Sequence, residues 1–260
     1  MKVVKFGGSS LASGNSVDKA LSIINADPER QVVVVSAPGK RTEDDIKVTD
    51  LMITYAYMSL RSNNYQDIAT RIFKRYELIA QYFELPEAEL EDIKQLLLTL
   101  PKLSYPNNDY RMATFKAHGE RLNAILIAKI LNHQGIKARF LEPKDVGLIV
   151  TGTSNNAEVN PETYVNLKRI KAAKDEKIIF PGFYGITPSG HIATFSRGGS
   201  DITGAILARG LNADLYENFT DVDAIFSANP HIVDQPKPIK RMTYQEMREL
   251  SYAGFSVFHD

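Results

Sequence analysis

A run of four valines at positions 32–35 constrains the fold of this chain more than any other feature. Successive side chains of a β-strand point to opposite faces of the sheet, so an unbroken apolar run needs a sheet that is covered on both faces. Such burial is typical of a parallel sheet between helical layers. Three further apolar segments predict strands of the same kind: 2–6, 178–180 and 214–219.

Helical patterns alternate with these strands. Residues 49–60, 66–83 and 111–131 carry apolar side chains at three- and four-residue spacing, and Gly135 closes the last of them. The triplet Asn-Pro-Glu at 160–162 predicts the start of a helix that continues to residue 173. The alternation of strand and helix predicts the α/β class, with a mainly parallel central sheet.

Residues 65–106 differ from the rest of the chain. The segment is acidic at its start, leucine-rich in its middle, and interrupted by Pro101 and Pro106. We interpret it as a helical insertion at one edge, acting as a lid or a packing element rather than as a catalytic one.

Composition excludes several classes of function. The chain of 260 residues has no cysteine, which excludes disulfide scaffolds, thiolate zinc sites and cysteine nucleophiles. Its 31 basic and 31 acidic residues provide no overall positive field for nucleic acid or for an anionic membrane. The sequence begins without a signal-peptide pattern, and its most apolar helical stretch, 122–131, is too short to span a bilayer. We therefore expect a soluble, cytoplasmic protein.

The last eleven residues, 250–260, read as a helix end followed by a new strand at 256–258. A chain that ends as it enters a strand suggests a domain that continues beyond this sequence.

The first glycine loop is Lys-Phe-Gly-Gly-Ser-Ser at 5–10, directly after the first predicted strand. Two glycines let a backbone approach a ligand closely and present its N–H groups, and the lysine adds a positive charge. The pattern is compatible with a cradle for nucleotide phosphates. The alternative is a tight turn with a surface lysine, since the loop is neither a Walker A motif nor a GxGxxG fingerprint.

The second glycine loop is Arg-Gly-Gly-Ser-Asp at 197–201, between a predicted strand at 192–195 and a helix at 202–211. Ser200 or Asp201 is placed to cap that helix, and Asp201 can also pair with Lys5. Arg197 can clamp a carboxylate with two parallel hydrogen bonds. If Asp201 is only a cap, the arginine and both glycines remain unexplained.

Two further segments fit a ligand site. Ser-Ala-Pro-Gly at 36–39 closes the valine strand at its carboxyl end, where open α/β sheets bind ligands, and Thr42 follows. His-Gly-Glu-Arg at 118–121 is expected at a helix start or kink, since a helical glycine is costly unless something approaches it closely. There Glu120 can accept an ammonium group, whereas His118 is interpreted as structural. In isolation, each segment would be read as an ordinary loop or a solvated helix face.

The combination of motifs is specific. Five strings follow one another along the chain: Lys-Phe-Gly-Gly-Ser-Ser, Ser-Ala-Pro-Gly, His-Gly-Glu-Arg, Arg-Gly-Gly-Ser-Asp and, at 219–223, Phe-Thr-Asp-Val-Asp. The set resembles the aspartokinases of the amino-acid kinase superfamily, over essentially the whole chain except the insertion. Sibling kinases for acetylglutamate, glutamate, carbamate or UMP share the sheet and a Gly-Gly loop, but not this set.

The resemblance implies one catalytic domain over 1–260, folded as a three-layer αβα sandwich with the amino-acid kinase fold. It implies ATP-dependent phosphorylation of the β-carboxylate of L-aspartate, the first step towards lysine, threonine and methionine. The partners implied are ATP with Mg²⁺, which the nucleotide phosphates mainly hold, so no metal site is expected in the protein. The family's C-terminal ACT regulatory domains are absent from this chain, and a homo-oligomer is expected for the longer form.

The resemblance also implies roles for single residues on the phosphate side. Lys5 would neutralise the transferring phosphoryl group, and Asp201 would orient that lysine. The phosphates would lie beside Gly7, Gly8 and Ser9.

On the acceptor side, Arg197 and Glu120 would hold the carboxylate and the ammonium of aspartate. Ser36, Thr42 and Ser200 would complete this side of the site.

The nucleotide side is where the sequence departs from the family. Thr220 and Asp221 would lie beside adenosine. Many members carry a tyrosine, a basic residue and a lysine where this chain has Phe226, His231 and Ser256. Two alternatives stay open: another amino-acid kinase of the acetylglutamate type, against which the order of motifs counts, and a non-catalytic aspartate-binding module with a degraded ATP site, which the departures at His231 and Ser256 support.

Overall fold

The computed structural model describes residues 1–61, 64–171, 173, 175–196, 198–220 and 233–252. It divides into two compact units, Met1–Phe219 and Thr220–Asp260. The first unit contains the sheet and is described first.

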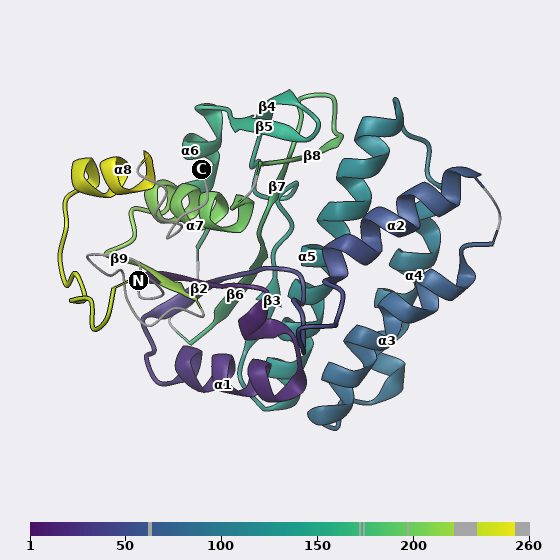
Figure 1. The fold of residues 1–260 in the computed structure, drawn as a ribbon, viewed down its shortest axis with the longest axis horizontal. Helices are drawn as coiled ribbons and strands as arrows, with labels where there is room; N and C mark the ends of the chain where they lie inside the picture. Colours follow the sequence, from purple (N-terminus) through teal and green to yellow (C-terminus); the bar gives the residue numbers. More distant parts are fainter. Residues whose placement is uncertain (62–63, 172, 174, 197, 221–232, 253–260) are drawn as a thin grey trace. The chain divides into compact units, whose positions relative to one another are not determined.

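The central sheet has five strands, and every neighbouring pair in it is parallel. Its order is β3-β6-β2-β1-β9, and Figure 1 labels β9, β2, β6 and β3 of these strands from left to right. The strands are β1 (Lys2–Phe6), β2 (Arg30–Val35), β3 (Ala138–Phe140), β6 (Lys177–Pro181) and β9 (Leu215–Phe219). The predicted parallel α/β sheet is thereby confirmed.

Both faces of this sheet are buried, which accounts for the valine run. Val33 and Val35 belong to a core shared with helices α1 (Gly14–Asn25) and α5 (Asn108–His133). Val32 and Val34 belong to a second core, together with Ile206 and Leu207 of helix α7 (Gly199–Gly210). In Figure 1 the sheet accordingly lies between α7 above and α1 below. The arrangement is the predicted layering of helices, sheet and helices.

Two antiparallel hairpins lie outside the main sheet. β4 (Val150–Thr153) pairs with β5 (Asn156–Val159), and β7 (Tyr184–Ile186) pairs with β8 (Ile192–Thr194). The backbone N–H of Thr194 donates to Ser154 O, so the second hairpin is hydrogen-bonded to the turn of the first.

Helix α6 (Glu162–Leu167) is shorter than predicted, because it ends at Leu167 rather than at 173. The side chain of Asn160 accepts from the N–H of Glu162, as a residue at a helix start does. The N–H groups of Arg169 and Ile170 bond to carbonyls only three residues back, and this tighter turn ends the α-helical pattern.

The predicted insertion is helical. After α2 (Val48–Arg61), it comprises α3 (Gln66–Tyr82), the 3₁₀ turn Glu87–Leu90, α4 (Glu91–Thr99) and the 3₁₀ turn Leu100–Lys102. These helices lie together on the right of Figure 1. Buried side chains of α3 and α4 belong to the same core as α1 and α5, so the insertion packs on the domain along its length.

Helix α5 runs without interruption over 26 residues, so the predicted helix start or kink at 118–121 is wrong. Position 119 is occupied by glycine for another reason. A Cβ at Gly119 would lie 2.9 Å from the Cβ of Ala37, so the loop after β2 approaches the helix too closely for a side chain.

The second unit contains helix α8 (Tyr244–Tyr252). Thr243 Oγ1 accepts from the N–H of Glu246, whose Oε2 accepts from the N–H of Thr243. This reciprocal pair is a capping box, which fixes the start of the helix. The strand expected at 256–258 lies outside the described residues.

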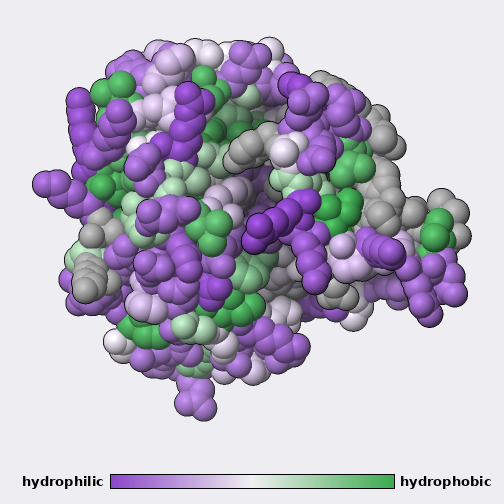
Figure 2. All heavy atoms as spheres, turned by 90° about the vertical axis from the view of Figure 1, so that its left-hand side faces the viewer, coloured by the Kyte–Doolittle hydropathy of each residue, from purple (hydrophilic) through white to green (hydrophobic). Residues whose placement is uncertain are grey.

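Within the described part of the chain, no helix is long and apolar enough to cross a membrane. The face drawn in Figure 2 carries hydrophilic side chains over most of its area, with hydrophobic ones in small patches among them.

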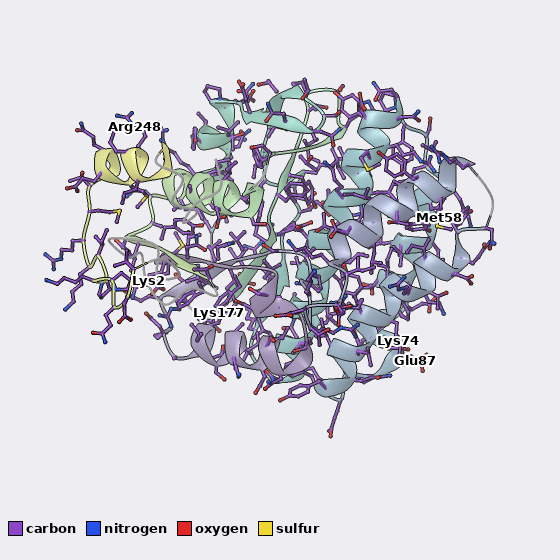
Figure 3. All side chains as sticks on the ribbon, in the orientation of Figure 1. Lys2, Met58, Lys74, Glu87, Lys177 and Arg248 are labelled. Carbon is purple, nitrogen blue, oxygen red and sulfur yellow. The ribbon has the colours of Figure 1, made fainter. Side chains whose placement is uncertain are left out.

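Lys177 ties the sheet to helix α1. The side chain, labelled in Figure 3, is only 8% exposed, and its Nζ donates to the carbonyls of Arg30 (2.9 Å), Asp27 (3.3 Å) and Ile24 (3.4 Å). One ammonium group thus satisfies carbonyls at the end of α1 and at the start of β2.

We expect Lys177→Met to lower the free energy of unfolding by about 1–3 kcal/mol, because buried carbonyls would lose their donor. Urea denaturation measures the change. Lys137→Met, at an exposed position before β3, is the control and should leave the midpoint nearly unchanged. Equal effects of the two substitutions would contradict this role of Lys177.

Candidate active site

The site begins where the central strands end. β1 has β2 on one side and β9 on the other, so the chain changes direction across the sheet at β1. Ligands of open α/β sheets bind outside the carboxyl ends of strands at such a switch point. The loops after β1 and β2 are the two that begin with Gly7 and Ser36.

These two loops contact each other through their backbones. The N–H of Gly39 donates to Gly8 O at 2.8 Å, and the N–H of Ser36 donates to Phe6 O at 3.2 Å. A Cβ at Gly39 would lie 2.6 Å from the carbonyl carbon of Gly8, and a Cβ at Gly8 would lie 2.9 Å from Ala37 O. Gly8 and Gly39 are therefore required by the close approach of the loops.

Gly7 has a different reason to be glycine. Among the described residues, the nearest atoms that a Cβ there would meet are Lys5 Nζ at 3.6 Å and Phe219 O at 4.0 Å. The absent side chain leaves open the space beside the lysine. That space is what a phosphate group needs if it is to approach the lysine and the backbone together.

Lys5 is held by an acid, as the sequence predicted. Its Nζ lies 2.7 Å from Asp201 Oδ1, and the lysine side chain is 9% exposed. Asn218 of β9 donates from Nδ2 to the same Asp201 oxygen at 3.0 Å. Sequence reasoning missed Asn218, although the parallel register of β1 and β9 pairs it with Lys5.

The start of helix α7 corrects one prediction. Neither Ser200 nor Asp201 caps the helix, because the residue at the cap position is Gly198, with φ of 75°. This left-handed conformation suits glycine. Asp201 lies within the first turn instead, where its carboxylate is engaged by Lys5 and Asn218.

Ser200 lies against the loop after β6. It is 7% exposed, and a Cβ at Gly182 would lie 2.4 Å from its Oγ. Phe183, which follows Gly182 in this loop, has a φ of 80°, and this backbone conformation is strained for a residue with a large side chain. Its N–H donates to Thr203 Oγ1 at 3.0 Å, which fixes this conformation against α7. Backbone strain of this kind often marks functional sites. No feature of the sequence predicts the positive φ of Phe183.

Glu120 faces the loop after β2 from helix α5. It is 5% exposed, and the backbone of Ala37 is close enough to favour its charged form. Burial raises the pKa of its carboxyl group to about 8, an effect that the Ala37 backbone and the charge of Lys116 partly offset. Its Oε2 has no hydrogen-bond partner among the described residues. A buried carboxyl group with one free oxygen is suited to a cationic ligand.

Asn123, one turn further along α5, holds the same loop. It is fully buried, and its Nδ2 donates to Ser36 O at 2.7 Å. Ser36 is half-buried, and Thr42 is exposed further along the loop. The structure thus brings Ser36 and Glu120 together through Ala37 and places Thr42 on the same connection.

Comparison with known proteins identifies the family. Residues 1–260 match the model of the amino acid kinase family. The chain belongs to this family. The superfamily that the motifs indicated is thereby confirmed.

Among curated relatives, this amino acid kinase is 53% identical to aspartokinase 3 of Bacillus subtilis (strain 168), over all of its own length and 57% of that protein. It is 29% identical to the chloroplastic bifunctional aspartokinase/homoserine dehydrogenase 2 of Arabidopsis thaliana, over 99% of its own length and 29% of that protein. The chain therefore spans a little over half of the first relative and less than a third of the second.

Solved structures give the same fold. The aspartate kinase of Clostridium acetobutylicum is 34% identical with a TM-score of 0.82, and the match covers 100% of this chain and 55% of that one. E. coli aspartokinase III, in a complex with aspartate and ADP, has a TM-score of 0.85 over 100% of this chain and 57% of that one. At 24% identity, the second match concerns the fold alone.

His118 is buried, and its pKa is lowered to about 3, mainly by burial and also by the charge of Arg121. Its Nδ1 faces Thr114 O at 2.8 Å, so Nδ1 carries the proton, and Nε2 accepts from Arg121 at 3.0 Å. Arg121 in turn pairs with Glu142. A neutral ring held between a carbonyl and an arginine agrees with the structural role expected from the sequence.

Of the remaining predicted site residues, some lie in the described part of the chain and some do not. Thr220 follows β9 directly and is exposed. The described residues contain no group of three or more His, Cys, Asp or Glu that could hold a metal ion. Five predicted positions lie outside the described residues: Arg197, Asp221, Phe226, His231 and Ser256.

The pKa of Glu120 predicts a pH-dependent cost to stability. Its pKa is raised from 4.5 to about 8 on folding, so between these values the unfolded chain loses a proton that the folded protein keeps. The cost grows as pH rises from 4.5 and is complete above 8. We expect Glu120→Gln, which removes the charge at constant shape, to stabilise the protein by a few kcal/mol at pH 8.5 and by little at pH 5. Urea denaturation at both pH values tests this, and a stability difference independent of pH would contradict it.

Proposed function

We propose that this chain is the catalytic domain of an aspartate kinase, which transfers the γ-phosphoryl group of ATP to the β-carboxylate of L-aspartate. The observation that carries the proposal is the ion pair between buried Lys5 and half-buried Asp201, next to Gly7, where no side chain fills the space beside the lysine. The 53% identity to aspartokinase 3 of B. subtilis and the fold shared with the C. acetobutylicum aspartate kinase support it.

The phosphate side of the proposed site follows from what phosphoryl transfer requires. The reaction depends mainly on in-line positioning and on neutralising charge. Lys5 supplies a positive charge whose direction Asp201 fixes, and Gly7 leaves room for the phosphates beside it. Gly8 and Ser9 complete this loop. Bound Mg²⁺ would supply further positive charge at the phosphates, and the nucleotide would mainly hold it.

The acceptor side needs no general base. The β-carboxylate of aspartate is already ionised at neutral pH. Its oxygen attacks the γ-phosphorus, the bond to the bridging oxygen breaks, and ADP leaves without a proton transfer. We assign Glu120 to the ammonium of aspartate and Arg197 to its α-carboxylate. Ser36, Thr42 and Ser200 would complete the acceptor side.

We assign the adenosine side to Thr220, Asp221, Phe226 and His231, on the strength of the sequence motifs. We also expect a cytoplasmic homo-oligomer that serves the synthesis of lysine, threonine and methionine.

Trapping of the acyl phosphate tests the proposed function. The chain is incubated with MgATP, hydroxylamine and aspartate, acetylglutamate or UMP, and hydroxamate and ADP are measured. Aspartate should be the acceptor that yields both products. ADP release with acetylglutamate or UMP alone would identify a sibling kinase, and aspartate binding without turnover would identify a non-catalytic module.

We expect Lys5→Ala to lower kcat by about a hundredfold or more, as removal of one transition-state donor does. Lys2→Ala is the matched control, because Lys2 lies at the other end of the same strand and pairs with Asp27 (Figure 3). The control should keep kcat within about twofold, since it removes a charge remote from the transferred group. An unchanged kcat in Lys5→Ala would contradict the phosphate-site assignment.

The pKa of Glu120 also predicts how substrate use depends on pH. An ammonium group binds the ionised carboxylate, but below pH 8 the free protein holds this carboxyl group protonated. Binding must then release a proton, so the KM for aspartate should rise about tenfold for each pH unit below 8. Initial rates between pH 6 and 9 measure this. In Glu120→Gln the KM should be high and nearly independent of pH, and a flat wild-type profile would refute the role.

A further inference from the structure

A buried arginine of helix α3, in the insertion, is hydrogen-bonded to the loop after β2. Arg75 is 5% exposed, and its Nη2 donates to Gly39 O at 2.6 Å. Its Nη1 donates to Ile46 O at 2.7 Å and lies 3.1 Å from Asp45 Oδ2. A single guanidinium thus holds both ends of the segment 39–46, which we call the acceptor loop.

The acceptor loop is also hydrogen-bonded internally. Asp45 accepts from Arg41 Nε at 2.7 Å and from Arg41 Nη2 at 3.0 Å, and its own N–H donates to Thr42 O at 3.1 Å. Asp45 therefore links the turn that carries Thr42 to Arg75. At its first residue, Gly39, the loop is bonded to Gly8 of the phosphate side.

The next residue of α3 holds the other half of the acceptor side. Tyr76 is fully buried, and its hydroxyl donates to Gly119 O at 2.9 Å. Gly119 immediately precedes Glu120 and is the point where α5 touches Ala37. Two consecutive side chains of the insertion thus bind the two backbone segments that carry Thr42 and Glu120.

Stability alone is a poor reason for a buried guanidinium at this place. Burying a charge is costly, and an apolar side chain of similar volume often serves packing as well or better. Arg75 Nε also lacks a hydrogen-bond partner among the described residues. The polar contacts that Arg75 makes within the described part of the chain, three in number, all go to the acceptor loop.

We propose that Arg75 is a positioning residue of the active site, which fixes the acceptor loop in the conformation that receives the amino-acid substrate. The inference rests on the proposed function for the identity of that substrate. The insertion is then a supporting wall of the acceptor half of the site, rather than a lid over it.

Amide hydrogen exchange of the acceptor loop tests the anchoring without any substrate. The variants are Arg75→Lys, which keeps the charge but loses the two-pronged geometry, and Asp45→Asn. Lys74→Met is the control, since Lys74 is exposed on the same helix and pairs with Glu77 (Figure 3). Exchange in 39–47 should be faster in both test variants and unchanged in the control, while exchange in β1 and β2 stays as in the wild type.

Steady-state kinetics test the positioning. Arg75→Lys should raise the KM for aspartate about tenfold or more, the factor expected from loss of a hydrogen bond to a charged group, with the KM for ATP within about threefold. A purely structural role would lower the amount of folded enzyme and leave both KM values unchanged. Tyr76→Phe should produce a smaller rise in the KM for aspartate.

The two arms separate the two hypotheses. The positioning role would be overturned if, in Arg75→Lys, the amides of the acceptor loop exchange as in the wild type and the KM for aspartate is unchanged. A wild-type chain without aspartate-dependent turnover would overturn the proposed function, and the exchange data would then decide the anchoring of the loop by themselves. If Arg75→Lys does not fold, Asp45→Asn still decides the question.

Discussion

The ion pair between Lys5 and Asp201 is the contact on which the candidate site depends. It joins the end of β1 to the first turn of α7, and Asn218 of β9 bonds to the same carboxylate. Because β1 lies between β2 and β9, the lysine is fixed at the point where the direction of the chain changes across the sheet. The loops around it are arranged with respect to this one charge.

The features that the sequence predicted are those that local patterns determine. The valine run requires burial on both faces, and the structure places alternate valines in two separate cores. The Gly-Gly pair after β1 predicts a backbone that approaches a ligand closely, whereas the close approach that the structure shows at Gly8 is to the backbone of the loop after β2. The pairing of Lys5 with Asp201 was predicted because opposite charges in two loops of one site attract each other, and their separation along the chain did not matter.

The predictions that failed depended on competition between partners that a local pattern does not reveal. Asp201 is a good helix cap by residue type, but the carboxylate is taken by Lys5 and Asn218, and glycine takes the cap position. Gly119 looked like a helix break, whereas it is a point of contact with Ala37 inside a continuous helix. Asn218 and Arg75 are ordinary residues in the sequence, and only the register of β9 and the packing of α3 give them a place at the site.

The two halves of the site are supported in different ways. The phosphate side follows directly from the sheet, since its loop is bonded to neighbouring strands by backbone groups such as Gly7 N–H to Phe219 O. Backbone geometry of this kind changes little when side chains are substituted. The acceptor side is held by the side chains of Asn123, Arg75 and Tyr76, and two of these come from the insertion. If the proposed function holds, substitutions in the insertion would therefore alter the choice of amino-acid acceptor while the loop after β1 keeps its shape.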